Sequence, residues 1–133
     1  MDMEIVFPAG KKVDALYKGF RIETDQSKKD GGEGSAPAPF DFFMVSIGTC
    51  AGIYALSFCQ ERNIPTENLK LFLRTEINKE KKRIGKIILT IQLPGEFPEH
   101  YRSAIVKAVN LCTVKRYMQD PPEFETITTA FSG

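Results

Sequence analysis

The feature that most constrains the fold is an uncharged run of eighteen residues, Phe42–Cys59, with the sequence FFMVSIGTCAGIYALSFC. As a helix it would be about 27 Å long, which is enough to cross a membrane. However, polar and small residues dilute its hydrophobicity, and its flanks carry neither an aromatic belt nor a one-sided cluster of Lys and Arg. We therefore expect no membrane span, but a helix covered on nearly every side by the rest of the chain or by a second subunit.

Sequence signals predict both ends of this helix. Pro39 suits the first turn, because the N–H that it lacks would be unpaired there, and Asp41 places negative charge near the positive end of the helix dipole. Asn63 and Pro65 are typical of a helix end. The sequence thus predicts a helix from about Pro39 to Arg62.

Residue patterns in the remainder of the chain predict short strands, two shorter helices and one loop. Apolar patterns predict strands at residues 4–7, 12–18, 20–24, 69–77, 84–93 and 124–130, and helices at 98–112 and 114–118. Residues 25–39, rich in Gly, Ser, Ala and Pro, are expected to form a mobile loop. This order indicates a single α+β domain over residues 1–133.

Composition excludes several classes of function. The formal net charge is +1, and the basic cluster at residues 79–83 lies between two predicted strands, so we expect a solvated hairpin tip and no nucleic-acid partner. Three cysteines and one histidine, without CxxC or HxxxH spacing, give no metal set. The N-terminus has no secretory pattern, so we expect a cytoplasmic protein.

The three cysteines are the candidate chemical groups. Cys50 and Cys59 lie nine residues apart on the predicted helix, about 13.5 Å along its axis and on opposite sides, so they cannot form a disulfide within it. Cys112 follows a different helix and is able to approach either of them. Gly48 and Gly52 flank Cys50 and favour a close neighbour there, because glycine inside a helix costs about 1 kcal/mol. The alternative is that all three thiols are inert core groups, with Cys59 as a small buried hydrophobe.

A family resemblance connects these features. The run from Ser35 to Cys50, SAPAPFDFFMVSIGTC, resembles the signature of the OsmC/Ohr family, the osmotically induced and organic-hydroperoxide-resistance proteins. In that pattern a proline-rich turn leads into an apolar helix that ends in Gly-small-Cys. A second family cysteine, about sixty residues further on, matches Cys112. The resemblance implies an OsmC-like α+β fold, with antiparallel sheets around a long buried central helix in an intertwined homodimer.

The resemblance also implies an activity. The chain is similar to thiol-dependent peroxidases, which reduce organic hydroperoxides in the oxidative stress response. The resemblance therefore implies peroxiredoxin-like chemistry and no cofactor. Cys50 would attack the peroxide and become a sulfenic acid, and Cys112 would capture it as a disulfide. An external dithiol reductant, in the family often a lipoylated protein, would restore both thiols.

Such chemistry needs a thiolate at neutral pH. An unperturbed thiol has a pKa of about 8.5, so a nearby cation has to favour the charged form. In the best-studied branch of the family, an arginine from the N-terminal strands has this role and is held by a carboxylate. The resemblance assigns the role to Arg21, with Glu33 or Asp41 as the carboxylate, although Asp41 suits a helix start better. A surface ion pair of Arg21 with Glu23 or another carboxylate is the alternative.

Four aromatic residues would form an apolar wall for an alkyl chain, with core packing as their alternative role: Phe42, Phe43, Tyr54 and Phe58. Thr113 stands where the hydroperoxide branch of the family has proline. A family member that reduces organic hydroperoxides more slowly is therefore an alternative. Two other functions also remain open. One is a non-catalytic dimer that binds a small apolar or oxidised ligand between its long helices, and the other is acyl or sulfur transfer through Cys50 alone.

Overall fold

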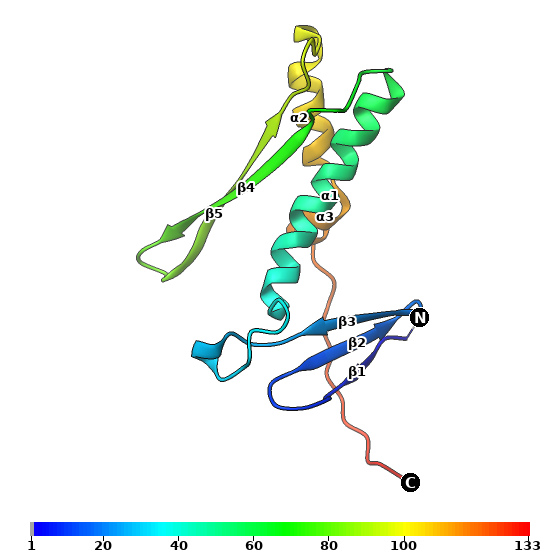
Figure 1. Cartoon of the computed structure of the whole chain (residues 1–133), viewed down its shortest axis with the longest axis vertical. Coiled ribbons are helices and arrows are strands. Elements are labelled where there is room, and N and C mark those ends of the chain that lie inside the picture. Colours follow the sequence, from blue (N-terminus) through cyan, green and yellow to red (C-terminus); the bar gives the residue numbers. More distant parts are fainter. Residues whose placement is uncertain (1) are drawn as a thin grey trace. The chain divides into compact units, whose positions relative to one another are not determined.

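The structure, a computed structural model, describes residues 2–133 as two compact units, one that ends at Ser46 and one that begins at Ile47 (Figure 1). The elements in chain order are β1 (Glu4–Val6), β2 (Val13–Tyr17), β3 (Phe20–Thr24), the 3₁₀ turn η1 (Lys28–Asp30), α1 (Pro39–Glu61), β4 (Lys70–Asn78), β5 (Arg83–Gln92), the 3₁₀ turn η2 (Glu99–Tyr101), α2 (Arg102–Asn110) and α3 (Thr113–Gln119). Both sheets are antiparallel, which confirms the α+β class.

The N-terminal sheet has the order β1-β2-β3 and one apolar face. Ile5, Ala15 and Ile22 lie opposite one another in neighbouring strands, and Phe20 shares their face because it precedes Ile22 by two residues. Ile5, Ile22 and Phe20 are all exposed. The apolar face of this sheet is therefore exposed within its own unit.

The segment predicted as a mobile loop is folded around the buried carboxylate of Asp25. This carboxylate accepts hydrogen bonds from the backbone N–H groups of Gln26, Glu33 and Ser35, at 2.7, 3.3 and 3.1 Å, and from the Ser35 hydroxyl at 2.6 Å. A side chain at Gly32 would collide with the carbonyl oxygen of Gln26, so the glycine permits this close packing.

Acid is expected to release this loop. The hydrogen bonds from the Ser35 side chain and backbone lower the pKa of Asp25 to about 2. Because this value is below the unfolded-state pKa of about 3.9, the carboxylate stabilises the fold fully above pH 4, and the contribution is lost as the pH falls towards 2. We expect Asp25→Asn to lower the amide-exchange protection of Glu33 and Ser35 at pH 7, and the wild type to lose it only below about pH 4.

Amide exchange followed by NMR measures both effects. The matched control is Asp30→Asn, because Asp30 is an exposed carboxylate in the same loop. Protection in Asp25→Asn equal to that of the wild type would contradict this account of the loop.

Helix α1 confirms the predicted helix to within one residue at its C-terminal end. At its start, the Asp41 carboxylate accepts a hydrogen bond from the Ala38 backbone N–H at 2.8 Å, as expected of a helix-start residue. A single stripe is buried, with members three or four residues apart: Ile47, Ala51, Ala55, Phe58 and Cys59. Residues 2–133 of one chain therefore bury one side of α1, and the cover by a second subunit stays a prediction.

The opposite side of α1 is apolar and exposed. Val45 and Ile53 have exposed fractions of 55% and 52%. Among residues 2–133, α1 is the one helix whose length and composition would allow it to cross a membrane, and 28% of its most apolar window is buried in the chain.

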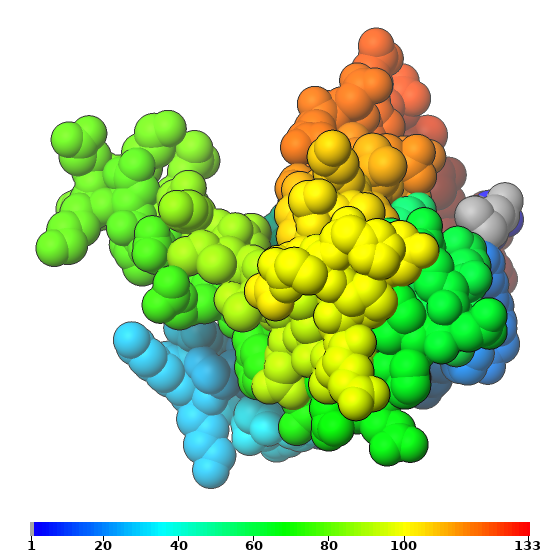
Figure 2. Space-filling view, turned by 90° about the horizontal axis from the view of Figure 1, so that it is seen from above, coloured from blue at the N-terminus to red at the C-terminus, as the bar shows by residue number. Residues whose placement is uncertain are grey.

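The core of the second unit lies between α1, α2 and the β4–β5 hairpin. Leu71 pairs with Ile91, and Leu73 with Leu89, so that one hairpin face is apolar. Leu71, Leu89 and Ile91 pack on a cluster that includes Phe58, Cys59, Ile105 and Val109. Figures 1 and 2 both show the far half of the hairpin projecting from the helices of its unit.

The C-terminal segment does not form the predicted strand. Residues 121–133 have no regular secondary structure, and they are exposed throughout, with Phe124 89% exposed. A strand needs a neighbour to pair its backbone N–H and C=O groups, and no strand among residues 2–133 pairs with this segment. The alternating pattern of residues 124–130 is present, but its partner edge is not.

Candidate functional site

Cys50 lies on the face of α1 that borders a cavity. It is half-buried and precedes Ile53, Tyr54 and Ser57 by three, four and seven residues. Side chains at these spacings share one face of a helix, and all three later residues line the cavity. Cys50 is therefore one helical turn before the cavity wall.

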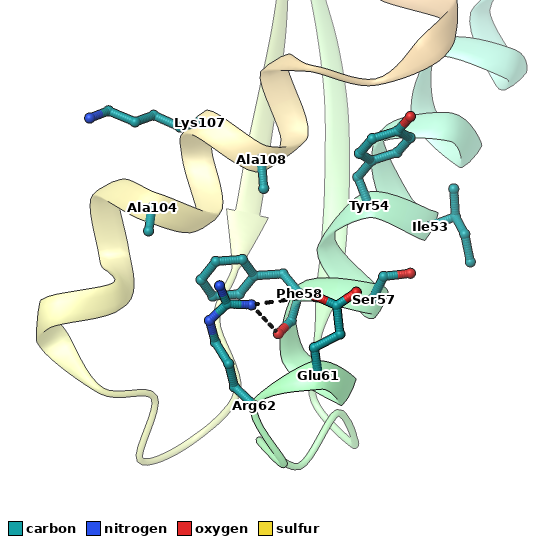
Figure 3. Close-up of a pocket in the computed structure, with 9 residues that line it drawn as sticks. All are labelled: Ile53, Tyr54, Ser57, Phe58, Glu61, Arg62, Ala104, Lys107 and Ala108. Carbon is teal, nitrogen blue, oxygen red and sulfur yellow. Dashed lines mark hydrogen bonds and ion pairs between the residues drawn. The ribbon is translucent and has the colours of Figure 1, made fainter.

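The cavity has a volume of about 470 Å³ and lies between α1 and α2 (Figure 3). Its lining combines apolar walls with a few polar groups: Ile53, Tyr54, Ser57, Phe58, Glu61, Arg62, Ala104, Lys107 and Ala108. In Figure 3 the amino end of Lys107 points away from the Phe58 ring. The charge of Lys107 is thus directed away from the ring, and the part of the cavity next to Phe58 is lined by apolar side chains such as Ala104 and Ala108.

Arg62 closes one end of this cavity. Its guanidinium carbon lies 3.6 Å from the centre of the Phe58 ring, and its Nη1 donates a hydrogen bond to the Phe58 carbonyl oxygen at 3.0 Å. The Glu61 carboxylate lies 3.8 Å from the same nitrogen. These contacts hold the Phe58 ring, which also meets Tyr101 edge-on with a centroid distance of 5.7 Å.

A hydroxyl pair joins the Cys112 region to the Cys50 turn of α1. Cys112 is 1% exposed and is the N-cap residue of α3. The next residue, Thr113, has its Oγ1 3.0 Å from the Tyr54 Oη, which is hydrogen-bond distance. Because Tyr54 is only about 6 Å beyond Cys50 along the helix axis, this contact brings the chain beside Cys112 close to Cys50.

Arg116 completes this cluster. Its Nη2 lies 3.4 Å from both the Tyr54 Oη and the Thr113 Oγ1. Arg116 is not among the site residues predicted from the sequence, although its position four residues after Cys112 was an available signal.

Cys59 has the structural role expected of it. It is fully buried in the core cluster of the second unit. Burial raises the pKa of the Cys59 thiol, and the nearby positive charge of Arg62 opposes this only in part. Since the thiolate is the reactive form, Cys59 is a poor candidate for a nucleophile.

The two glycines beside Cys50 do not make room for its sulfur. Gly48 and Gly52 are two residues from Cys50, so they point to the other side of α1. A Cβ added at Gly52 would meet nothing within 4 Å, and one at Gly48 would meet only a Leu73 methyl group at 4.0 Å. The open surface that the glycines create is therefore not next to the thiol.

Arg21 is held by Asp14, a carboxylate other than the three named from the sequence. Its Nε and Nη2 lie 2.9 and 2.8 Å from Oδ2 of Asp14, which is buried. The β2–β3 register explains this, since Asp14 and Arg21 are diagonal neighbours on one face. Glu33 pairs with Lys12 at 3.1 Å instead. Arg21 belongs to the unit that ends at Ser46, and Cys50 to the other unit.

The remaining predicted residues have mixed positions. Tyr54 and Phe58 line the cavity, whereas Phe42 and Phe43 do not. Phe43 is exposed and packs on Phe40, with a centroid distance of 5.4 Å. Among residues 2–133, no group of three or more His, Cys, Asp or Glu side chains comes together that could hold a metal ion.

The fold and the site together define a class: an α+β protein with a long apolar helix that carries Cys50 beside a cavity, and with a further free cysteine, Cys112, next to the residue that contacts Tyr54 of that helix. Comparison with family models identifies the family. The model of the OsmC-like protein family matches residues 32–127, and the chain belongs to this family.

Solved structures of low sequence identity share the fold. An OsmC-like protein from Mycoplasma pneumoniae has a TM-score of 0.70 and 14% identity, over 90% of this chain and 87% of the other. A protein from Psychrobacter arcticus, described as an osmotic stress induced and detoxification response protein, has a TM-score of 0.71 and 15% identity, over 86% and 85%. An organic hydroperoxide resistance protein OsmC from Legionella pneumophila has a TM-score of 0.59 and 16% identity, over 90% of each chain. No curated protein matches the sequence.

Proposed function

We propose that this chain is a thiol-dependent peroxidase that reduces organic hydroperoxides, with Cys50 as the attacking thiol and Cys112 as the resolving thiol. The observation that carries the proposal is the 3.0 Å contact between Tyr54 and Thr113, because it keeps the Cys112 segment beside the Cys50 turn. Cys50 is half-buried and Cys112 is buried, so Cys50 is the thiol that a peroxide reaches first. The description of the Legionella relative as an organic hydroperoxide resistance protein supports the same activity.

The reaction has three steps. The Cys50 thiolate attacks the terminal oxygen of the hydroperoxide, the O–O bond breaks, and the alkoxide takes a proton and leaves as an alcohol. The Cys112 sulfur then attacks the Cys50 sulfenic acid, the S–O bond breaks, and water leaves as the disulfide forms. A dithiol reductant, for which a lipoylated protein is the family's example, supplies the two electrons that restore both thiols.

The cavity beside Tyr54 and Phe58 would hold the alkyl part of the substrate. Its volume of about 470 Å³ is within the range of small-molecule sites, which is about 300–1,000 Å³. Cys50 lies one turn before this wall, so an alkyl chain in the cavity would present its peroxide end towards the thiol. The same cavity favours the second candidate function, the binding of a small apolar ligand without catalysis.

We also propose that the protein is a homodimer in which a second copy covers the exposed stripe of α1. Among residues 2–133, three apolar surfaces are exposed: this stripe around Val45 and Ile53, the N-terminal sheet face around Phe20, and the segment 121–133. Exposed apolar surfaces of this kind are typical of protein–protein interfaces.

The test of the peroxidase proposal is a mass measurement under non-reducing conditions. After one equivalent of tert-butyl hydroperoxide, we expect the chain to lose two hydrogens and a peptide map to contain Cys50 linked to Cys112. Cys59→Ala is the control and should give the same linked peptide. An unchanged mass, together with saturable binding of an apolar fluorescent probe, would favour the non-catalytic alternative.

A further inference from the structure

We infer that Arg116 supplies the positive charge that stabilises the Cys50 thiolate, and that the Tyr54 and Thr113 hydroxyls hold it in position. This inference rests on the proposed function and names a residue for it. It starts from the contacts of Arg116, which follows Cys112 by four residues and whose Nη2 lies 3.4 Å from the Oη of Tyr54, a side chain one turn beyond Cys50.

The guanidinium of Arg116 is free of carboxylates. Among residues 2–133, no Asp or Glu oxygen forms an ion pair with it, and its polar contacts are the two neutral hydroxyls at 3.4 Å. Its positive charge is therefore not neutralised within the chain. By contrast, both nitrogens of Arg21 that contact Asp14 are committed to one buried carboxylate oxygen.

The other charged and titratable groups near the site do not replace Arg116. Glu61 and Arg62 lie at the far end of the cavity and are 3.8 Å apart, while Lys107 points out of it. Tyr117 and Asp120 line a hollow of about 710 Å³ along α3 together with Arg116. Of these groups, Arg116 is the cation that contacts the turn after Cys50.

The hydroxyl contacts restrict the side chain of this exposed arginine to the turn after Cys50. Arginine loses much side-chain entropy when it is fixed, so an isolated surface arginine would sample many rotamers. Two acceptors on different helices, Tyr54 on α1 and Thr113 on α3, favour the rotamers that place Nη2 between them. A positive charge near a thiol favours its thiolate form, because opposite charges attract.

The experiment measures Cys50 alkylation by iodoacetamide as a function of pH, read by peptide mass, and needs no peroxide. Arg116→Met is expected to lower the Cys50 alkylation rate at pH 7 about tenfold and to move the midpoint of the pH profile up by about one unit. Arg116→Lys keeps the charge and should retain most of the rate. Tyr54→Phe removes the positioning hydroxyl and should shift the profile in the same direction by a smaller amount.

Lys115→Met is the matched control, because Lys115 is the adjacent cation on α3 and its Nζ bonds Asn110 Oδ1 at 2.9 Å. It removes the same charge and should leave the Cys50 profile unchanged. An Arg116→Met profile that coincides with that of the wild type would overturn the inference, as would an equal shift in Lys115→Met. A wild type that alkylates rapidly but does not consume peroxide would refute the proposed function and leave the role of Arg116 intact.

Discussion

Replacing Cys50 by serine is expected to abolish the consumption of organic hydroperoxide, with a loss of about a thousandfold or more in a dithiothreitol-coupled assay. The reason is chemical, because a thiolate attacks the peroxide oxygen and a serine hydroxyl remains protonated near pH 7. Cys50 is half-buried and outside the core cluster, so the substitution should not unfold the chain. Equal turnover by wild type and Cys50→Ser would remove the peroxidase proposal.

Cys112→Ser should stop the reaction one step later. The Cys50 sulfenic acid would persist, be trapped by dimedone, and advance to the sulfinic acid when peroxide is in excess. Cys59→Ala is the control, because Cys59 is buried in the core. This variant should turn over peroxide at the wild-type rate. A Cys112→Ser variant that turns over at the wild-type rate would instead favour chemistry through Cys50 alone.

The second large effect is expected at the exposed stripe of α1. In detergent-free buffer, light scattering should give twice the mass of one chain, and Val45→Glu should convert the protein to a monomer. A carboxylate placed in an apolar interface loses its hydration without a partner, which costs at least about 3 kcal/mol, or roughly a hundredfold in dimer affinity.

Val106→Glu is the matched control for that substitution. Val106 is a helical valine with a similar exposed fraction, 48%, but its neighbours on α2 and η2 include charged side chains such as Glu99 and Arg102. It should leave the mass unchanged. A wild-type monomer in buffer would contradict the homodimer, and a protein that is recovered only in detergent would favour a membrane role for α1 instead.

Local pattern predicted the elements that depend on nearby residues. The ends of α1, the first five strands and the two short C-terminal helices follow from alternation, helical spacing and proline positions, and the structure has all of them within a few residues. The strand at residues 124–130 failed because pairing needs an edge from elsewhere. The loop around Asp25 was missed because its order comes from one buried carboxylate, which composition does not reveal.

The sequence alone determined the long apolar helix, the positions of the cysteines and the resemblance to the OsmC/Ohr family, since each depends on residue type and spacing along the chain. Tertiary structure alone decided that Thr113 meets Tyr54, that Arg116 joins them, and that Asp14 is the carboxylate of Arg21. The physical reason is distance along the chain. Tyr54 and Thr113 are 59 residues apart, so only the packing of α1 against the C-terminal helices of its unit brings their hydroxyls within 3.0 Å.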